Sequence, residues 1–325
     1  MPGKQDNVKR GQLRNATALN FQNTVRAISS RVVLKGTGAG AEDLPRRIDH
    51  DNASLASAVA YDIRGVLMFV ALETSREVAV LDAHSGAQVT RFDVGRAPQG
   101  LTLSADGFTL YVNNFMDRSV GVYDLRPLLT AGIAAVPSLT TLQAVDTERL
   151  SPTVLKGKQL FYDARDPRLA ADRYMSCAVC HNDGGHDGRT WDLTHAGEGL
   201  RNTISLRGRA GGQGRLHWSA NFDEVQDFEG QIRALAGGTG LMTDPQFGTG
   251  TRGQPLGDPK AGVSADLDAL AAYVASLNSF ELSPQRNADG SLTATAATGK
   301  TIFQAQCLGC HGTSAFTVSS ATGSL

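Results

Sequence analysis

Arg64-Gly-Val-Leu-Met-Phe-Val70 returns 42 residues later as Asp106-Gly-Phe-Thr-Leu-Tyr-Val112. At the same offset, Arg76-Glu-Val-Ala-Val-Leu-Asp82 returns as Arg118-Ser-Val-Gly-Val-Tyr-Asp124. Both pairs show the apolar alternation and turn residues typical of short strands. A repeat of about 40–45 residues made of short strands is typical of a β-propeller blade, and an ordinary β-meander is the alternative. The sequence therefore predicts an all-β region over residues 51–135.

Two repeats do not close a propeller, because closed propellers have at least about four blades. The string Tyr111-Val-Asn-Asn114 resembles the YVTN family of bacterial propeller repeats. Residues 1–50 show no clear match to the repeat, and we expect them to be ill-defined or to supply part of another blade. The expected N-terminal architecture is therefore a partial propeller.

All four cysteines fall into two Cys-x-x-Cys-His strings, Cys177-Ala-Val-Cys-His181 and Cys307-Leu-Gly-Cys-His311. Two sulfurs at this spacing add across the two vinyl groups of one porphyrin, and the adjacent His ligates its iron. The motifs thus predict two covalently bound c-type haems. Cys177, Cys180, Cys307 and Cys310 are the attachment residues, and His181 and His311 are the proximal iron ligands.

Two other chemistries use paired cysteines. Two Cys-x-x-Cys pairs can hold one structural zinc ion, and a single pair can act as a thioredoxin-type redox dithiol. Neither chemistry needs a His directly after the second Cys in both copies. The long separation of the two pairs also suits two haem sites better than a compact zinc module.

The segments before the two motifs are similar. Lys156-Gly-Lys-Gln-Leu-Phe161 precedes the first and Thr298-Gly-Lys-Thr-Ile-Phe303 the second. Both resemble the opening helix of a cytochrome c domain, in which a Gly permits close helix crossing and an aromatic ring packs near the haem. The alternative is that Gly and Phe merely recur in two short helices. The first copy carries extra residues, 163–175, which we expect to form a loop.

Further helices are indicated after the first motif. Ser264 is a plausible N-cap for a helix over residues 266–277, in which Leu267, Leu270, Val274 and Leu277 form one apolar stripe. A second amphipathic stretch spans residues 225–235. The sequence therefore predicts a mainly α cytochrome c-type haem domain over residues 150–282 and a polar linker over 283–297. Residues 290–325 are expected to be the start of an incomplete second haem domain.

The region around the first motif carries a more specific resemblance. It contains Cys177-Ala-Val-Cys-His181, Gly199-Leu-Arg-Asn-Thr-Ile-Ser-Leu206, Leu216-His-Trp218 and Asp227-Phe-Glu-Gly-Gln-Ile232. These strings resemble the bacterial di-haem cytochrome c peroxidase superfamily, which includes the MauG type, over about residues 150–320. The resemblance implies electron transfer and reduction of hydrogen peroxide by an oxidoreductase. It also implies a small redox protein or a quinol-linked donor as electron source.

The same resemblance suggests roles for several residues. Trp218 best matches the tryptophan that relays electrons between the haems. His195 is the favoured distal ligand of the first haem, with His217 and Met242 as alternatives. Glu198, Glu224 and Glu229 are candidate acids without a family match. Because only a short segment follows His311, the second haem is expected to lack part of its enclosure, and enzymatic activity depends on whether the peroxidase site is complete.

The bulk composition excludes some functions. The chain has 325 residues with 31 basic and 32 acidic ones interspersed, so no nucleic-acid partner is indicated. No apolar run is long enough for a membrane span. Two c-type haems imply a periplasmic or otherwise extracytoplasmic protein, yet the N-terminus carries no signal peptide, so we expect truncation at both ends. His50 and His84 lie in the β region and are expected to be solvated.

Three functions fit these observations. The first is a di-haem peroxidase or MauG-like oxidase. The second is a non-catalytic electron-transfer cytochrome. The third is a propeller-based binding protein in which the haems relay electrons to a bound partner.

Overall fold

The computed structural model describes residues 1–8, 25–34, 36, 38, 40–194, 199–208, 216–279 and 283–312. The chain divides into two compact units, one formed by Met1–Cys180 with Gln231–Gly240 and the other by His181–Gly230 with Leu241–Leu325. Within the described ranges, no helix has the length and apolar character needed to cross a membrane.

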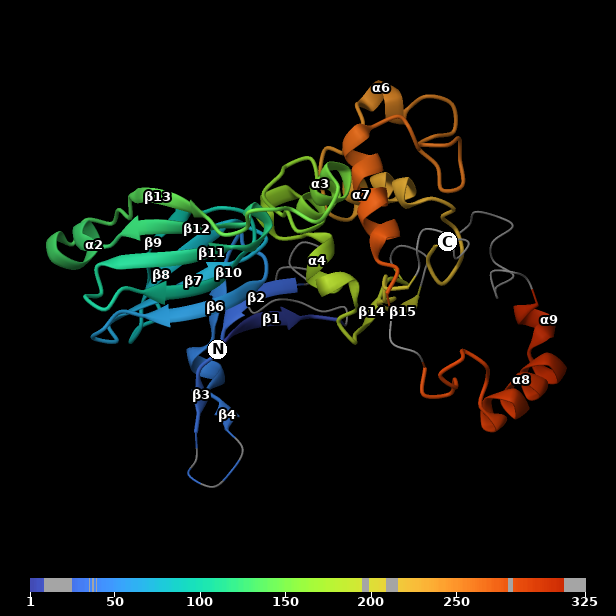
Figure 1. Cartoon of the computed structure of the whole chain (residues 1–325), viewed down its shortest axis with the longest axis horizontal. Helices are drawn as coiled ribbons and strands as arrows, with labels where there is room; N and C mark the ends of the chain where they lie inside the picture. The colour runs from blue at the N-terminus through green and yellow to red at the C-terminus, as the bar shows by residue number, and fades with distance from the viewer. Residues whose placement is uncertain are drawn as a thin grey trace. The chain divides into compact units, whose positions relative to one another are not determined.

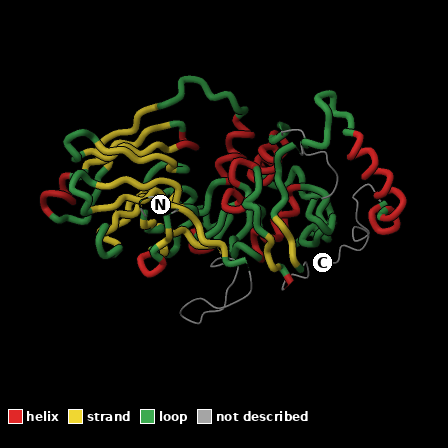
Figure 2. Tube along the Cα trace, turned by 90° about the horizontal axis from the view of Figure 1, so that it is seen from below, coloured by secondary structure: helices red, strands yellow, loops and turns green. Residues whose placement is uncertain are grey.

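Two four-stranded antiparallel sheets dominate the first unit (Figures 1 and 2). One contains β6 (Ala56–Tyr61), β7 (Leu67–Leu72), β8 (Glu77–Asp82) and β9 (Gln88–Asp93). The other contains β10 (Pro98–Leu103), β11 (Thr109–Asn114), β12 (Ser119–Asp124) and β13 (Ser138–Gln143). The first three strands of each sheet are related by the 42-residue offset of the sequence repeat. The predicted blade-like repeat is therefore confirmed.

A third sheet lies at the N-terminus. It contains β1 (Pro2–Asp6), β2 (Val25–Ser29) and β5 (Ile48–His50), and a separate hairpin of β3 (Val32–Val33) and β4 (Ala41–Glu42) is inserted between β2 and β5. β6 contacts both β1 and β10, so the first strands of the three sheets follow one another. This order is that of successive propeller blades, and residues 1–50 contribute one of the three sheets.

The middle sheet is buried on both faces. On β7, Phe69 packs into a core shared with β11 and β12, whereas Met68 and Val70 pack toward β2 and β6. β7 and β8 therefore read as nearly continuous apolar runs, because a strand covered on both faces needs apolar residues at every position. The two cores hold the three sheets together.

The connection between the third and fourth strands differs between the two large sheets. Helix α2 (Arg126–Ala131) lies between β12 and β13 and ends at Gly132, whose φ of 65° favours glycine. This insertion moves β13 to Ser138–Gln143, past the residue-135 limit expected from the sequence.

The rest of the chain consists mainly of short helices and loops. In chain order the remaining elements are η1 (Leu44–Arg46), η2 (Phe115–Asp117), α3 (Pro152–Phe161), η3 (Ala171–Arg173), α4 (Cys177–Cys180), η4 (Asn182–Gly184), β14 (Thr190–Asp192), β15 (Leu200–Asn202), η6 (Val225–Phe228), α5 (Glu229–Ala234), α6 (Asp244–Phe247), α7 (Ala265–Ser276), α8 (Ala294–Gln306) and α9 (Leu308–His311). A β-sheet region is thus followed by a mainly helical one, and the predicted multidomain fold class is confirmed.

Two helical predictions have different outcomes. Helix α7 has Ser264 as its N-cap, and Leu267 and Leu270 are buried, as the sequence predicts. The stretch 225–235 is not one continuous amphipathic α-helix, because it begins as the 3₁₀ helix η6 and continues as α5. Its buried side includes Asp227 and Glu229, which the apolar stripe did not reveal.

Candidate functional site

The first Cys-x-x-Cys-His motif forms a tight local structure. Cys177 and Cys180 begin and end the single-turn helix α4, and His181 follows directly. All four cysteines of the chain are described, and none of them forms a disulfide. Burial raises the pKa of the Cys177 thiol to about 11. Two cysteines on one helical turn that form no disulfide fit the two thioether bonds of a c-type haem.

His181 is held by backbone carbonyls. Its Nδ1 lies 3.2 Å from the Gly185 carbonyl oxygen and donates to it. Burial lowers the pKa of His181, while hydrogen bonding to the Gly185 and Ile204 carbonyls opposes that effect. A donor bond from Nδ1 selects the tautomer whose Nε2 carries the lone pair, which is the form that ligates iron. The donor set therefore fits a proximal haem ligand.

The loop that holds His181 is itself fixed by neighbours in the second unit. The amide of Gly184 donates to the His181 carbonyl at 2.9 Å, and the amide of Leu206 donates to the Gly184 carbonyl at 2.9 Å. Gly184 has φ of 71°, and a Cβ there would lie 2.7 Å from a methyl group of Leu277. A side chain at this position would be strained by the positive φ and would displace the Leu277 side chain, so the turn after the motif packs tightly against the end of α7.

Trp191 is a buried aromatic residue that the sequence reasoning did not select. It lies on β14, is 8% exposed and donates its Nε1–H to both Asp187 Oδ2 and Thr203 Oγ1 at 3.1 Å. An indole N–H needs an acceptor when it is buried, and these two partners supply it. Its proximity in sequence to His181 was the one signal available, and it is not specific.

Trp218, the predicted electron relay, lies at the surface. It is 51% exposed, and its Nε1 donates to the Asn202 carbonyl at 2.8 Å. Its backbone neighbour His217 has a φ of 63°, an uncommon conformation for a residue other than glycine. The relay role of Trp218 stays a prediction.

The distal-ligand candidates have different surroundings. His195, the favoured candidate, lies outside the described residues, as does Glu198. The His217 ring lies 4.2 Å from the Phe222 ring centroid and 5.1 Å from that of Phe228, and its Nδ1 is 2.8 Å from Asn221 Oδ1. Met242 is 4% exposed. Both remain candidates as distal ligands.

The carboxylates of two candidate acids accept hydrogen bonds from backbone amides. Glu229 is fully buried and accepts hydrogen bonds from the amides of Leu241 and Met242 at 2.9 and 3.1 Å. Glu224 accepts from the amides of Lys260 and Ala261 at 2.5 and 3.2 Å. Carboxylates placed this way fix the chain around Met242 and the loop before α7.

The same loop contains a buried ion pair. Lys260 Nζ lies 2.5 Å from Asp227 Oδ1, and both side chains are at most 2% exposed. A buried cation needs such a partner, because an unpaired buried charge is strongly destabilising. The apolar pattern of the sequence carried no signal for this pair.

The second motif has a different environment. Helix α8 carries Gly299 and Phe303, as the internal repeat predicts, and it leads into α9, which ends at His311. The ring centroids of Phe303 and His311 lie 6.2 Å apart. Within the described residues, neither helix contains a buried residue, whereas Gly157 and Phe161 in α3 are both buried. Helix α8 begins at Ala294, so it includes the end of the predicted linker.

Residues 152–279 match the family model of the di-haem cytochrome c peroxidase. Among solved structures, the chain is similar to the periplasmic gluconolactonase of Pseudomonas aeruginosa, with 18% identity over 42% of this chain and 39% of that one and a TM-score of 0.30. It is also similar to a β-propeller domain from Myceliophteria thermophila, with 16% identity over 37% and 40% and a TM-score of 0.29.

A third solved structure is the hydrazine synthase of Kuenenia stuttgartiensis, with 17% identity over 34% of this chain and 26% of that one and a TM-score of 0.24. The chain thus spans well under half the length of each of these three proteins. The search of curated proteins found no match. The part of the chain that is similar to the peroxidase family contains the first haem motif, α3 and α7.

Proposed function

We propose that this chain is an extracytoplasmic c-type haem protein that transfers electrons and reduces hydrogen peroxide. The observation that carries the proposal is the His181 imidazole, which directly follows the Cys-x-x-Cys turn of α4 and has its Nδ1 bonded to the Gly185 carbonyl. The family match over residues 152–279 supports the same conclusion, because it associates this stretch with di-haem electron transfer.

The residues of the chain have distinct parts in this function. Cys177 and Cys180 would attach the first haem and His181 would ligate its iron, while Cys307, Cys310 and His311 would hold the second. When bound, haem would supply a redox-active iron that can exchange single electrons and react with peroxide. The Gly185 carbonyl orients His181 and raises its basicity as a ligand.

Peroxide reduction needs more than attachment of haem. Any further iron ligand would have to be displaceable or absent, and the candidates for that ligand are His195, His217 and Met242. Electrons would come from a small redox protein or a quinol-linked donor, with Trp218 as the proposed relay.

The first experiment measures haem stoichiometry. We expect the chain, exported through a leader in a host that matures c-type cytochromes, to carry two haems by pyridine haemochrome assay and to keep them on a denaturing gel. Cys177→Ala/Cys180→Ala and Cys307→Ala/Cys310→Ala should each lose one haem. Zinc in place of haem, or haem that dissociates on denaturation, would contradict the attachment.

The second experiment separates the peroxidase from a simple electron carrier. We expect a high-spin band in the optical spectrum of the two-haem protein and turnover of hydrogen peroxide with a reduced donor. His217→Ala and Met242→Leu should reveal the distal ligand, because loss of that ligand converts a low-spin band into a high-spin one. Two low-spin haems without turnover would exclude peroxide reduction and leave electron transfer.

A further inference from the structure

Two consecutive residues accept hydrogen bonds from the two tryptophans of the chain. Strand β15 ends at Asn202, whose carbonyl accepts the Nε1–H of Trp218 at 2.8 Å. The next residue is Thr203, whose Oγ1 accepts the Nε1–H of Trp191 at 3.1 Å. Trp218 is 51% exposed and Trp191 is 8% exposed, so this segment connects a surface indole to a buried one.

The same segment continues to the proximal haem ligand. The residue after Thr203 is Ile204, whose backbone carbonyl forms a hydrogen bond with the His181 side chain. A second connection runs through Asp187, whose Oδ2 accepts the Trp191 Nε1–H at 3.1 Å. Burial lowers the pKa of His181, and the negative charge of Asp187 opposes that shift. Trp191 is therefore joined to the surroundings of His181 in two ways.

The carboxylate of Asp187 gives Trp191 more than a place in the core. A buried indole N–H needs one acceptor, and the Thr203 hydroxyl already supplies it. Loss of one electron would leave a positive charge on the indole, and a carboxylate at hydrogen-bond distance lowers the energy of that charge. Burial strengthens the effect, because less water screens it. Trp218 differs, since it is exposed and bonded to a neutral carbonyl.

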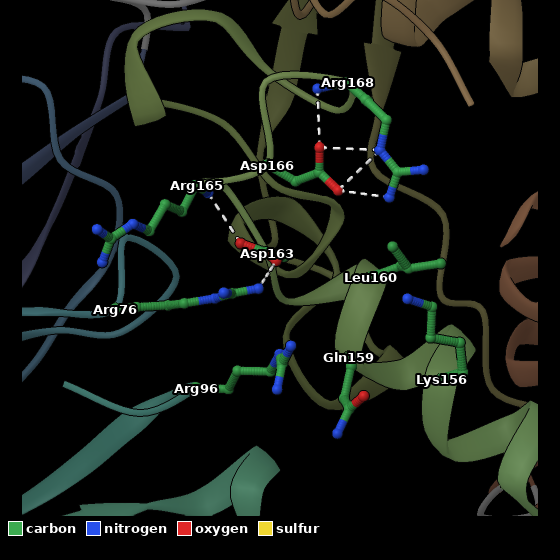
Figure 3. A pocket seen from close by; sticks show the side chains of 9 residues that line it. All are labelled: Arg76, Arg96, Lys156, Gln159, Leu160, Asp163, Arg165, Asp166 and Arg168. Atoms are coloured by element: carbon green, nitrogen blue, oxygen red, sulfur yellow. Dashed lines mark hydrogen bonds and ion pairs between the residues drawn. The ribbon is translucent and has the colours of Figure 1, made fainter. Parts of the chain in front are cut away.

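The polar cavity formed by the segment before the first motif has a different character (Figure 3). Its volume is about 330 Å³, and the described side chains around it are charged, amide or aliphatic. Arg76 forms an ion pair with Asp163 there. Arg168 forms another with Asp166. These side chains balance one another's charge and do not exchange single electrons, so this cavity offers no electron route.

We propose that Trp191 is a redox-active residue that passes single electrons from Trp218 at the surface to the first haem, and that Asp187 stabilises its oxidised form. The inference rests on the proposed peroxide reduction, because hydrogen peroxide is the oxidant. Reduction of hydrogen peroxide to two water molecules takes up two electrons from the donor protein and two protons from solvent. In the step assigned to Trp191, the indole loses one electron toward the first haem, keeps its Nε1 proton and regains the electron through Trp218.

The test is electron paramagnetic resonance of the haem-loaded full chain, frozen directly after mixing with hydrogen peroxide in the absence of donor. We expect an organic radical signal whose hyperfine pattern changes when the protein contains ring-deuterated tryptophan. Trp191→Phe should remove this signal, because phenylalanine keeps an aromatic ring in the core but has a less electron-rich π face and no N–H. The optical spectrum of the haems and far-UV circular dichroism check the haem content and the fold of each variant.

Asp187→Asn and Thr203→Val form a matched pair of variants. Asp187→Asn keeps an acceptor for the indole N–H but removes the negative charge, so the radical signal should become weaker and decay faster. Thr203→Val removes the neutral acceptor and leaves the charge in place, so it should affect the signal much less. Trp218→Phe should keep the signal but slow its disappearance when reduced donor is added, because it removes the surface indole.

Two results would overturn the role of Trp191 and leave the proposed function in place. One is peroxide turnover by the wild type without a tryptophan signal, and the other is a signal that Trp191→Phe does not change. Equal losses in Asp187→Asn and Thr203→Val would overturn the electrostatic role of Asp187. A two-haem protein that does not react with peroxide would instead contradict the proposed peroxide reduction, and the inference with it, so turnover by the wild type distinguishes the two failures.

Discussion

His50 is enclosed at the end of β5, although the sequence placed it in solvent. It is 2% exposed, and its Nε2 lies 2.9 Å from Ser29 Oγ. Burial, together with a smaller effect of the positive charge of Arg91, lowers the pKa of His50 to about 4, and Asp51 opposes both effects. The expectation of a solvated His50 was wrong because the third sheet, which encloses it, has no repeat signal. His84 is exposed, as expected.

The stability of the protein should depend on pH through His50. The folded pKa of about 4 lies below the unfolded value of about 6.5, so the unfolded chain takes up the proton first. The contribution of neutral His50 to the free energy of unfolding should be fully present above pH 6.5. The free energy of unfolding should then fall by about 2 kcal/mol by pH 5. Urea denaturation across this range measures it.

His50→Gln provides the comparison. Glutamine does not titrate, so the slope between pH 6.5 and pH 5 should become smaller, whereas His84→Gln should leave it unchanged. An equal slope in the wild type and in His50→Gln would show that other groups cause the dependence.

The residues of the haem site differ in how far the sequence reveals them. The thiols and imidazole of Cys177-Ala-Val-Cys-His181 are evident because their chemistry demands a fixed spacing. The burial of Glu229 and Trp191 is not evident, since their partners are backbone amides and side chains brought together by folding. The spacing of residues along the chain reveals a site of covalent attachment. The burial of a polar side chain depends on residues that are distant in the sequence.

At the scale of elements, the N-caps of α7 and α8 allow the stability of the two helices to be compared. Ser264 Oγ accepts from the Leu267 amide at 3.4 Å and donates to the Leu241 carbonyl at 2.8 Å. Ser264→Ala should lower the free energy of unfolding by about 1–2 kcal/mol, because loss of an N-cap costs about that much. Chemical denaturation followed by circular dichroism measures the change.

Thr293→Ala removes the corresponding cap of α8, where Thr293 Oγ1 accepts from the Ala296 amide at 3.3 Å. Helix α8 has no buried residue, so this change should leave the main unfolding transition in place. A loss of global stability as large as that of Ser264→Ala would mean that α8 unfolds together with the rest.

Element prediction succeeded where one physical cause was dominant. The strands β7 and β11 follow the 42-residue repeat, and α7 follows its apolar stripe and cap. Prediction fell short for η6 and α5, because Asp227 and Glu229 are buried through a lysine and backbone amides rather than through apolar contact. It also fell short for β13, which α2 displaces along the chain.

At the scale of the whole molecule, a buried carboxylate joins the sheets to the segment before the haem motif. Glu77 on β8 is 4% exposed, and its carboxylate lies 2.6 Å from Arg173 Nη1 and 3.3 Å from Arg91 Nη1. Glu77→Gln leaves two arginines without their anion and should lower the free energy of unfolding by roughly 3 kcal/mol. Urea denaturation is the measurement.

Glu42→Gln is the control for that change. Glu42 pairs with Arg47 at the surface, where solvent screens the interaction, so its replacement should alter the unfolding midpoint far less. Equal shifts for the two variants would contradict the role of Glu77 as a connecting residue.

The outermost strand β13 has a practical consequence for handling the protein. It pairs with β12 on one side and lies at the end of its sheet. Its six residues, Ser-Leu-Thr-Thr-Leu-Gln, are all exposed and none carries a charge. Such an edge offers free amide and carbonyl groups to a strand from another molecule, which natural proteins usually prevent with lysine or proline. Concentrated stocks are therefore prone to intermolecular strand pairing at this edge, and a lysine engineered into it is the natural remedy.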